Sequence, residues 1–190
     1  MAHRLATLVT GASSGIGAAL AASFAREPSR VLVLVARRTA PMHALAEEFK
    51  NRFGTETQVI EADLEVPGAA AQLLAQIDQL GLTVDTLVNN AGFGLNGPLQ
   101  DMTLARVSGM LQLNITALTE LTHGVVPAMR ARRSGRILNV ASIAAFQPCP
   151  NFAAYGASKA YVLSFSEALA IELETSGITV TAVCPGSTAS

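Results

Sequence analysis

Short apolar runs alternate with longer amphipathic stretches from one end of the chain to the other. The stretches between the runs carry apolar residues three and four positions apart, as helices do. Most of the runs themselves are continuously apolar, which is typical of parallel strands that helices cover on both faces. The expected strands are Leu5–Thr10, Arg30–Ala36, Thr57–Ala62, Thr86–Asn89, Arg136–Val140 and Thr179–Cys184, and the expected helices are Gly15–Arg26, Ala40–Phe53, Gly68–Leu80, Leu104–Ala131 and Phe152–Ser176.

This order of elements predicts an α/β fold. Strict alternation of strands and helices, joined by right-handed crossovers, builds a doubly wound parallel sheet between two layers of helices, which is the Rossmann fold. The sequence contains no internal repeat, low-complexity tract or Pro/Gly/Ser-rich linker. We therefore expect residues 1–190 to form a single three-layer domain.

Composition narrows the class of partner. Half of the 190 residues are apolar, only 14% are charged, and 13 Lys+Arg nearly balance 14 Asp+Glu. These values exclude intrinsic disorder and argue against a protein that binds nucleic acid or a membrane surface through charge. A small molecule is the expected partner.

The lack of a recognisable targeting or membrane-spanning pattern and the arrangement of the cysteines favour a cytoplasmic location. The longest aliphatic stretch, Val31 to Ala36, is far shorter than the roughly 20 residues that span a bilayer, and no signal-peptide core follows Met1. Cys149 and Cys184 make no CxxC pair, disulfide framework or metal site, which fits a reducing compartment. No bound metal is expected, and Cys184 is expected in the core.

A glycine-rich turn joins the first strand to the first helix with the spacing GxxxGxG. A dinucleotide pyrophosphate binds backbone N–H groups at a helix N-terminus, and glycines let the backbone approach it closely. The spacing differs from the ordinary GxGxxG pattern, and glycines here could serve only a tight turn. The position at the first strand–helix junction favours a nucleotide. The expected phosphate-binding residues are Gly11, Ser13, Ser14, Gly15, Ile16 and Gly17.

Arg37 and Arg38 follow the second strand, where an NAD-binding protein places an acid against the ribose 2′-hydroxyl. A guanidinium there suits a 2′-phosphate, so NADP(H) is favoured over NAD(H) as the cofactor. Asp63, after the third strand, can accept a hydrogen bond from the adenine amino group. The alternatives are a solvated strand end for the arginines and a turn cap for Asp63.

Ser142, Tyr155 and Lys159 are expected at the carboxyl edge of the sheet, where such folds hold their ligands. Tyr155 and Lys159 stand four residues apart in one predicted helix and share a face, although this spacing alone often arises by chance. A phenol has a pKa of about 10, and a neighbouring ammonium stabilises the phenolate, which permits acid–base work near neutral pH. Ser142 can donate to a substrate oxygen.

Asn114 is a polar residue in an otherwise apolar helical stretch, a position for which asparagine is poorly suited. Such a departure from the local pattern often marks a functional site. Asn114 could bind a water that links Lys159 to solvent in a proton relay. The alternative is an ordinary buried amide bonded to a loop.

Together these segments resemble the short-chain dehydrogenases/reductases, in their single-domain branch. The resemblance covers essentially the whole chain and implies Tyr155 as acid–base, Ser142 and Lys159 as its supports and Asn114 in the relay. Residues 93–99 and 144–150 look most like the NADP-preferring bacterial members. The matching segments are Thr10–Gly17, Asp63-Leu64, Asn89-Asn90-Ala91-Gly92, Asn114, Ser142, Tyr155 with Lys159, and Pro185-Gly186. Through this resemblance the cofactor-binding set gains Leu64, Asn90, Ala91, Gly92, Pro185, Gly186 and Thr188, besides Tyr155 and Lys159.

Members of that family continue well past the Pro-Gly motif, with a substrate loop, another helix and a seventh strand. This sequence ends at Ser190. We therefore expect a domain truncated relative to the family, without its C-terminal strand; the alternative is that the sequence covers only a portion of a longer protein.

The leading interpretation is an NADP-dependent oxidoreductase that moves hydride between nicotinamide and a carbonyl or alcohol carbon. Its expected substrate residues are mostly apolar and favour a small hydrophobic ketone or alcohol. Cys149 is expected in the pocket wall rather than as a nucleophile, since no His is placed in sequence to activate it. The substrate residues are Phe93, Ala144, Cys149 and Phe152, together with Ser142.

Two other functions stay open. One is a nucleotide-binding sensor or scaffold without turnover, against which the intact Ser-Tyr-Lys set argues. The other is a sugar-nucleotide epimerase or dehydratase of the related extended architecture, which usually has a GxxGxxG turn and a long C-terminal domain. A homodimer or homotetramer is expected, paired through the helices that carry Asn114 and Tyr155, with ordinary packing against the sheet as the alternative. The leucines available for pairing are Leu104, Leu111, Leu118 and Leu121.

Overall fold

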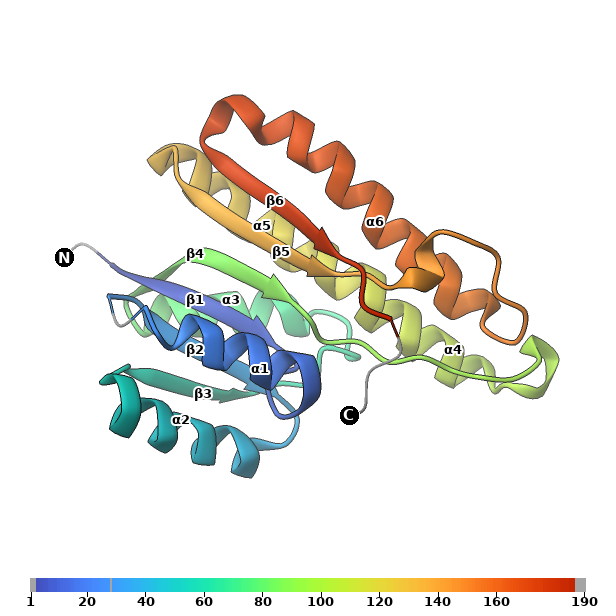
Figure 1. Ribbon diagram of the computed structural model, residues 1–190, viewed down its shortest axis with the longest axis horizontal. Coiled ribbons are helices and arrows are strands. Elements are labelled where there is room, and N and C mark those ends of the chain that lie inside the picture. Colours follow the sequence, from blue (N-terminus) through green and yellow to red (C-terminus); the bar gives the residue numbers. More distant parts are fainter. Residues whose placement is uncertain (1–2, 28, 187–190) are drawn as a thin grey trace.

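The computed structural model describes residues 3–27 and 29–186, and in this part of the chain six parallel strands form one sheet (Figure 1). The strand order is β3-β2-β1-β4-β5-β6. From β1 the chain adds β2 and β3 on one side of the sheet, and then β4, β5 and β6 on the other side. The strand order therefore reverses between β1 and β4, which leaves a crevice at their carboxyl ends. The predicted doubly wound sheet is confirmed. The strands are β1 (Arg4–Thr10), β2 (Val31–Ala36), β3 (Thr57–Glu61), β4 (Leu82–Asn89), β5 (Gly135–Val140) and β6 (Ile178–Val183).

Helices cover both faces of the sheet (Figure 1). One face packs against α1 and α2, and the other against α3, α5 and α6. The helices are α1 (Gly15–Phe24), α2 (Thr39–Phe53), α3 (Ala69–Gln79), α4 (Leu104–Leu111), α5 (Leu118–Arg132) and α6 (Ala153–Leu173), with short 3-10 turns at η1 (Leu99–Asp101), η3 (Ile143–Ala145) and η4 (Glu174–Ser176).

The central strands are apolar along their whole length because each face has its own core. Val33 and Val35 of β2 pack into the layer of α3 and α5, whereas Leu32 and Leu34 pack into the layer of α1 and α2. Leu8 of β1 lies opposite Val33 on one side and Leu87 of β4 on the other. Alternating side chains therefore fill two cores at once, which produces the unbroken apolar runs.

The helix expected over Leu104–Ala131 is not uniform. A π-helical segment, η2 (Gln112–Ala117), joins α4 to α5 without leaving helical dihedral angles at either junction. A π-helix adds a residue to the turn and shifts the side chains that follow. Asn114 lies within this segment, so the predicted single helix is corrected at the position of the residue singled out for its polarity.

The strand expected at Thr86 begins four residues earlier, at Leu82. The charged residue Asp85 interrupts the apolar run, so the pattern did not predict the first residues of this strand. The Asp85 side chain is nevertheless only 5% exposed. The carboxylate accepts a 2.6 Å hydrogen bond from Nε of Arg30, which also pairs with Glu27. Glu27 in turn pairs with Arg136 of β5. This ionic cluster ties the starts of β2, β4 and β5 together.

No helix among residues 3–27 and 29–186 has the length and apolar composition to cross a membrane. The same residues contain no group of three or more His, Cys, Asp or Glu that could hold a metal ion. Both cysteines are free, and Cys184 is only partly buried, packed beside Leu118, Ala141 and Val162.

We expect the substitution Asp85→Ala to lower the free energy of unfolding by about 2–3 kcal/mol, because it leaves Arg30 without its buried partner. The control is Glu56→Ala, which breaks the exposed Arg4–Glu56 pair and should cost much less, because solvent screens that pair. Urea unfolding followed by circular dichroism measures both. Equal losses in the two variants would contradict a structural role for the cluster.

Candidate functional site

The turn between β1 and α1 approaches the loop after β4 so closely that only glycine fits. Gly11 has φ +66°, and a Cβ added there would lie 2.7 Å from Nδ2 of Asn90. A Cβ at Gly17 would overlap both the Gly11 carbonyl oxygen and the Asn90 side chain. These two glycines are therefore required by the contact between the two loops.

Hydrogen bonds lock the same two loops together. Nδ2 of Asn90 donates to the carbonyl oxygens of Thr10 (2.9 Å) and Gly11 (3.2 Å). Oγ1 of Thr10 accepts from the backbone N–H groups of Asn90 and Ala91, each at 3.0 Å, and donates to the Val88 carbonyl. The turn is thus held in one position relative to β4.

The start of α1 is open to an anion. Ser14 is its N-cap residue, but the Ser14 side chain makes no capping hydrogen bond, and no acidic residue stands in the first turn. The first amides of a helix have no partner within the helix, and its dipole favours negative charge there. These features fit the pyrophosphate expected at this turn.

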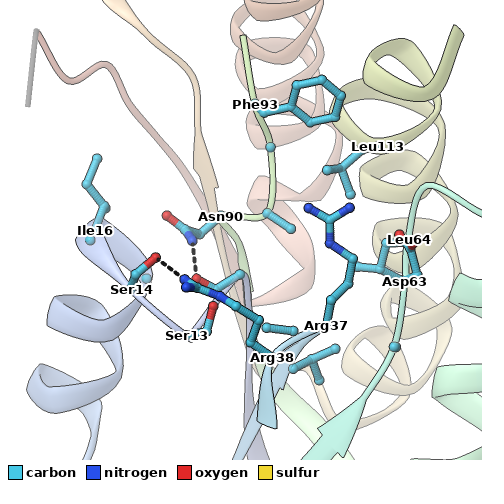
Figure 2. Close-up of a pocket in the computed structure, with 18 residues that line it drawn as sticks. Ser13, Ser14, Ile16, Arg37, Arg38, Asp63, Leu64, Asn90, Phe93 and Leu113 are labelled. Atoms are coloured by element: carbon cyan, nitrogen blue, oxygen red, sulfur yellow. Dashed lines mark hydrogen bonds between the residues drawn. The ribbon is translucent and has the colours of Figure 1, made fainter. Parts of the chain in front are cut away.

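A cleft of about 450 Å³ opens between this turn and the ends of β2, β3 and β4 (Figure 2). The structure brings to it most of the residues expected to hold a nucleotide. Tyr155, Lys159, Pro185 and Gly186 do not line it, and Thr188 lies outside the described residues. The predicted lining residues are Gly11, Ser13, Ser14, Gly15, Ile16, Gly17, Arg37, Arg38, Asp63, Leu64, Asn90, Ala91 and Gly92; sequence analysis missed Val35, Ala36, Ala62 and Leu113.

The two arginines after β2 point in different directions (Figure 2). Nη2 of Arg38 donates to Oγ of Ser14 at 3.3 Å, on the glycine turn. Nη1 of Arg37 donates instead to Oε1 of Glu65 at 2.6 Å. Glu65 was not expected at the site, because the partners are 28 positions apart and no local sequence pattern reveals the pair. Oδ1 of Asp63 accepts from the Glu65 N–H at 3.0 Å, so Asp63 does cap its turn; its adenine contact stays a prediction.

Lys159 lies at the centre of a second group of residues. Its Nζ donates to the Val140 carbonyl at 2.8 Å and lies 5.9 Å from the centre of the Tyr155 ring. A Cβ added at Gly92 would be 3.5 Å from Nζ of Lys159 and 2.9 Å from Oδ1 of Asn114. Lys159 and Asn114 therefore meet beside Gly92, which itself lines the cleft, and the Tyr155 ring lies two residues along the same loop, 3.2 Å from a Cβ added at Gly94.

The Asn114 side chain is a buried amide bonded to a loop. Its Oδ1 accepts from the Phe93 N–H at 3.2 Å, and its Nδ2 donates to the Phe93 carbonyl and to Oγ of Ser158, each at 3.0 Å. Oγ of Ser158 donates to the Tyr155 carbonyl at 2.7 Å. Asn114 thus positions the loop after β4 against α6, and its part in a proton relay stays a prediction.

Ser142 is buried just beyond the end of β5, which stops at Val140. Its Oγ accepts from the Ala144 N–H at 3.2 Å and so begins the short turn η3. The chain from Val140 to Ser142 therefore offers both the carbonyl that anchors Lys159 and the Ser142 hydroxyl.

The residues expected to contact substrate do not share one cavity. Phe93 lines the nucleotide cleft, with the Arg106 guanidinium 4.8 Å from its ring centre. Ala144 and Cys149 line a separate, largely apolar hollow of about 630 Å³ between residues 144–150 and α6. Phe152 packs edge-on against the Tyr155 ring, with centroids 5.9 Å apart.

A buried polar chain that was not predicted joins β4, β5 and α6. Nδ2 of Asn89 donates to Oδ1 of Asn139 (2.9 Å) and to Oγ1 of Thr122 (3.0 Å). Nδ2 of Asn139 donates to Oγ of Ser166 at 2.9 Å, seven residues along α6 from Lys159. Asparagines inside apolar strands were the available signal. These hydrogen bonds position α6 against β5 next to Val140.

Burial changes the chemistry of Lys159, which is only 6% exposed. Removing the ammonium from water lowers the pKa of Lys159 to about 8, and the nearby Cys184 opposes part of this change. The side chain is therefore mostly protonated at pH 7, and a modest rise in pH neutralises it.

The lowered pKa predicts how stability depends on pH. Between pH 8 and the ordinary value of 10.5, the unfolded chain holds a proton on Lys159 that the folded chain has lost. Stability from this residue therefore rises across that window, by up to about 3 kcal/mol. Subtracting the pH–stability curve of Lys159→Met from that of the wild type isolates the rise, because other groups titrate in both proteins. Parallel curves would contradict it.

Comparison with known proteins gives a consistent result. The family model described as short chain dehydrogenase matches residues 5–190. Sulfoacetaldehyde reductase 2 of Chromohalobacter salexigens is 38% identical over 181 residues, which make up 94% of this chain and 71% of that protein.

Solved structures agree in shape as well as in sequence. A short-chain dehydrogenase from Sphingobium yanoikuyae in complex with NADPH has a TM-score of 0.90 and 38% identity, covering 97% of this chain and 71% of its own. The bulky-bulky ketone specific alcohol dehydrogenase from Comamonas testosteroni has a TM-score of 0.89 and 35% identity, covering 99% and 74%.

Proposed function

The chain belongs to the short-chain dehydrogenase family, and from that premise we propose that it is an NADP(H)-dependent oxidoreductase that interconverts a carbonyl and an alcohol. The observation that carries the proposal is the place of Lys159. Its buried ammonium stands beside the Tyr155 ring and next to Gly92, which lines the cleft.

The cleft has the donors that NADP(H) needs. The first amides of α1 and the glycine turn suit the pyrophosphate, and the basic end of β2 suits a 2′-phosphate. Leu64 and Leu113 supply apolar surface for the adenine ring on the same side of the cleft as Asp63. The NADPH in the Sphingobium complex supports this choice of cofactor. When bound, the nicotinamide supplies or accepts the hydride.

The protein's own residues move the proton. Tyr155 gives its phenolic proton to the carbonyl oxygen in reduction and takes it back in oxidation. The Lys159 ammonium stabilises the phenolate, and its charge acts strongly because the site around it is buried. Ser142 donates to the substrate oxygen and stabilises the charge that develops there. Asn114 keeps the loop that carries Gly92 and Phe93 in place against α6.

We propose a small hydrophobic ketone or alcohol as the substrate. Phe152 presents its ring beside Tyr155, and the neighbouring hollow with Ala144 and Cys149 is largely apolar. The Comamonas relative, named for bulky ketones, supports this class.

The reaction is tested by substituting the only two tyrosines one at a time. Tyr155→Phe should lower turnover of hydrophobic ketones by about 10²–10⁴-fold, because the proton donor is lost, while NADPH affinity changes little. Tyr161→Phe is the matched control on the same helix and should retain turnover. Turnover comes from NADPH absorbance and affinity from NADPH fluorescence.

Three outcomes would count against the proposal. Failure of folded wild-type protein to bind either NADPH or NADH would exclude the cofactor. Binding without any turnover would favour a nucleotide sensor or scaffold. Equal turnover in Tyr155→Phe and the wild type would remove Tyr155 from the proton transfer.

We also propose that the protein pairs as a homodimer or homotetramer through α5 and α6. Tyr161 stays 38% exposed while stacking on Phe165, with ring centroids 5.7 Å apart, and its hydroxyl lies 3.0 Å from Oγ1 of Thr119 on α5. An ordered aromatic pair at the surface is typical of an interface. Leu118 and Leu121 face the core instead, so ordinary packing accounts for them.

Tyr161→Glu should shift the protein to monomers in sedimentation velocity, because a carboxylate would be buried in the interface. Leu80→Glu, a change of the same kind at an exposed residue after α3, should leave the oligomer intact. A monomeric wild type, or dissociation of both variants alike, would contradict pairing through this surface.

A further inference from the structure

We infer that Glu65 sets cofactor selectivity by separating the tasks of the two arginines after β2. Glu65 holds Arg37 along the adenine side of the cleft, and this leaves Arg38 to bind the 2′-phosphate and to distinguish NADPH from NADH. The inference rests on the proposed NADP(H)-dependent function.

Glu65 is built to hold its partner in place. Its side chain is 17% exposed, whereas that of Arg37 is 61% exposed, so the carboxylate is the enclosed member of the pair. Its Oε2 lies against α4, where a Cβ added at Gly109 would be only 3.0 Å away. The Glu65 backbone N–H is held by Asp63. A carboxylate confined by a helix and a turn fixes the guanidinium that it binds.

Arg38 lies at the other end of the cleft. Its guanidinium reaches Ser14, the N-cap residue of α1, as Figure 2 shows. In the part of the chain that the structure describes, no carboxylate lies within salt-bridge distance of Arg38. The ribose of a dinucleotide lies between the end of β2 and the glycine turn. No carboxylate of the described residues therefore competes with a 2′-phosphate for Arg38.

Charge decides which arginine takes the phosphate. A phosphate that approached Arg37 would also meet the negative carboxylate of Glu65. A phosphate at Arg38 would meet a guanidinium that has no carboxylate partner among the described residues, and the positive end of α1. Arg37, held near Leu64 and Leu113 in the same cleft lining, presents a planar group suited to packing against the adenine ring. Adenine is common to both cofactors, so Arg37 contributes to both affinities.

Two fragments that differ only in the 2′-phosphate test this division. Calorimetry gives the dissociation constants of adenosine 5′-monophosphate and adenosine 2′,5′-bisphosphate. The first constant divided by the second is the ratio that measures selectivity for the 2′-phosphate. Arg38→Gln should lower the ratio by about tenfold or more, because a charge-assisted contact is lost. Arg37→Gln should weaken both fragments alike and keep the ratio within about twofold. Glu65→Gln should raise the ratio about threefold, because Arg37 becomes free and a repelling charge is removed.

The controls make the same changes of charge elsewhere. Glu61→Gln alters an exposed carboxylate at the end of β3, and Arg130→Gln alters an exposed arginine on α5. Both should leave the ratio unchanged. Thermal melts establish that each variant folds.

Three results would overturn the inference. The first is a ratio that collapses in Arg37→Gln but survives in Arg38→Gln, and the second is a Glu65→Gln ratio that matches the wild type and Glu61→Gln. The third is wild-type protein that binds neither fragment nor NADPH, and only this result would also overturn the proposed function.

Discussion

The site depends on one close contact, between the glycine turn after β1 and the loop after β4. A side chain at Gly17 would collide with the Gly11 backbone and with Asn90, and Asn90 itself bridges the two loops. The contact lies where the strand order reverses, so the sheet opens a crevice that the turn then borders. Because the side chains of Asn90 and Thr10 hydrogen-bond the backbone across this contact, the protein's own residues hold the turn at the border of the cleft.

The loop after β4 extends this order to the residues proposed for proton transfer. Its first residues hold the glycine turn, and its next two, Gly92 and Phe93, contact Asn114 and Lys159. Asn114 in turn reaches Ser158 on α6, the helix that carries Tyr155. One short segment therefore contacts both the nucleotide end of the cleft and the residues proposed for proton transfer.

Local patterns were enough to predict the strands, the helices and most of the cleft, because apolar periodicity and the glycine turn act over a few residues. They failed where a buried or enclosed polar side chain has a hydrogen-bond partner that is distant in the sequence. Asp85 concealed the start of β4 because its partner, Arg30, is 55 residues distant. Glu65 and the Asn139–Ser166 link were missed for the same reason. The π-helical segment escaped because its apolar spacing still resembles an α-helix, and the split of the substrate residues between two cavities depends on how residues 144–150 pack on α6.

Lys159 shows how the fold trades stability for chemistry. Burying an ammonium disfavours its charged form, and only one protein acceptor, the Val140 carbonyl, compensates among the hydrogen bonds of the described residues. The same burial strengthens the attraction between that ammonium and a phenolate at Tyr155, since water no longer screens it. The hydrogen bond from Asn139 to Ser166 ties α6, the helix that carries Lys159, to β5. A lysine with a solvated ammonium would reduce the stability of the fold less, but it would also stabilise the phenolate far less.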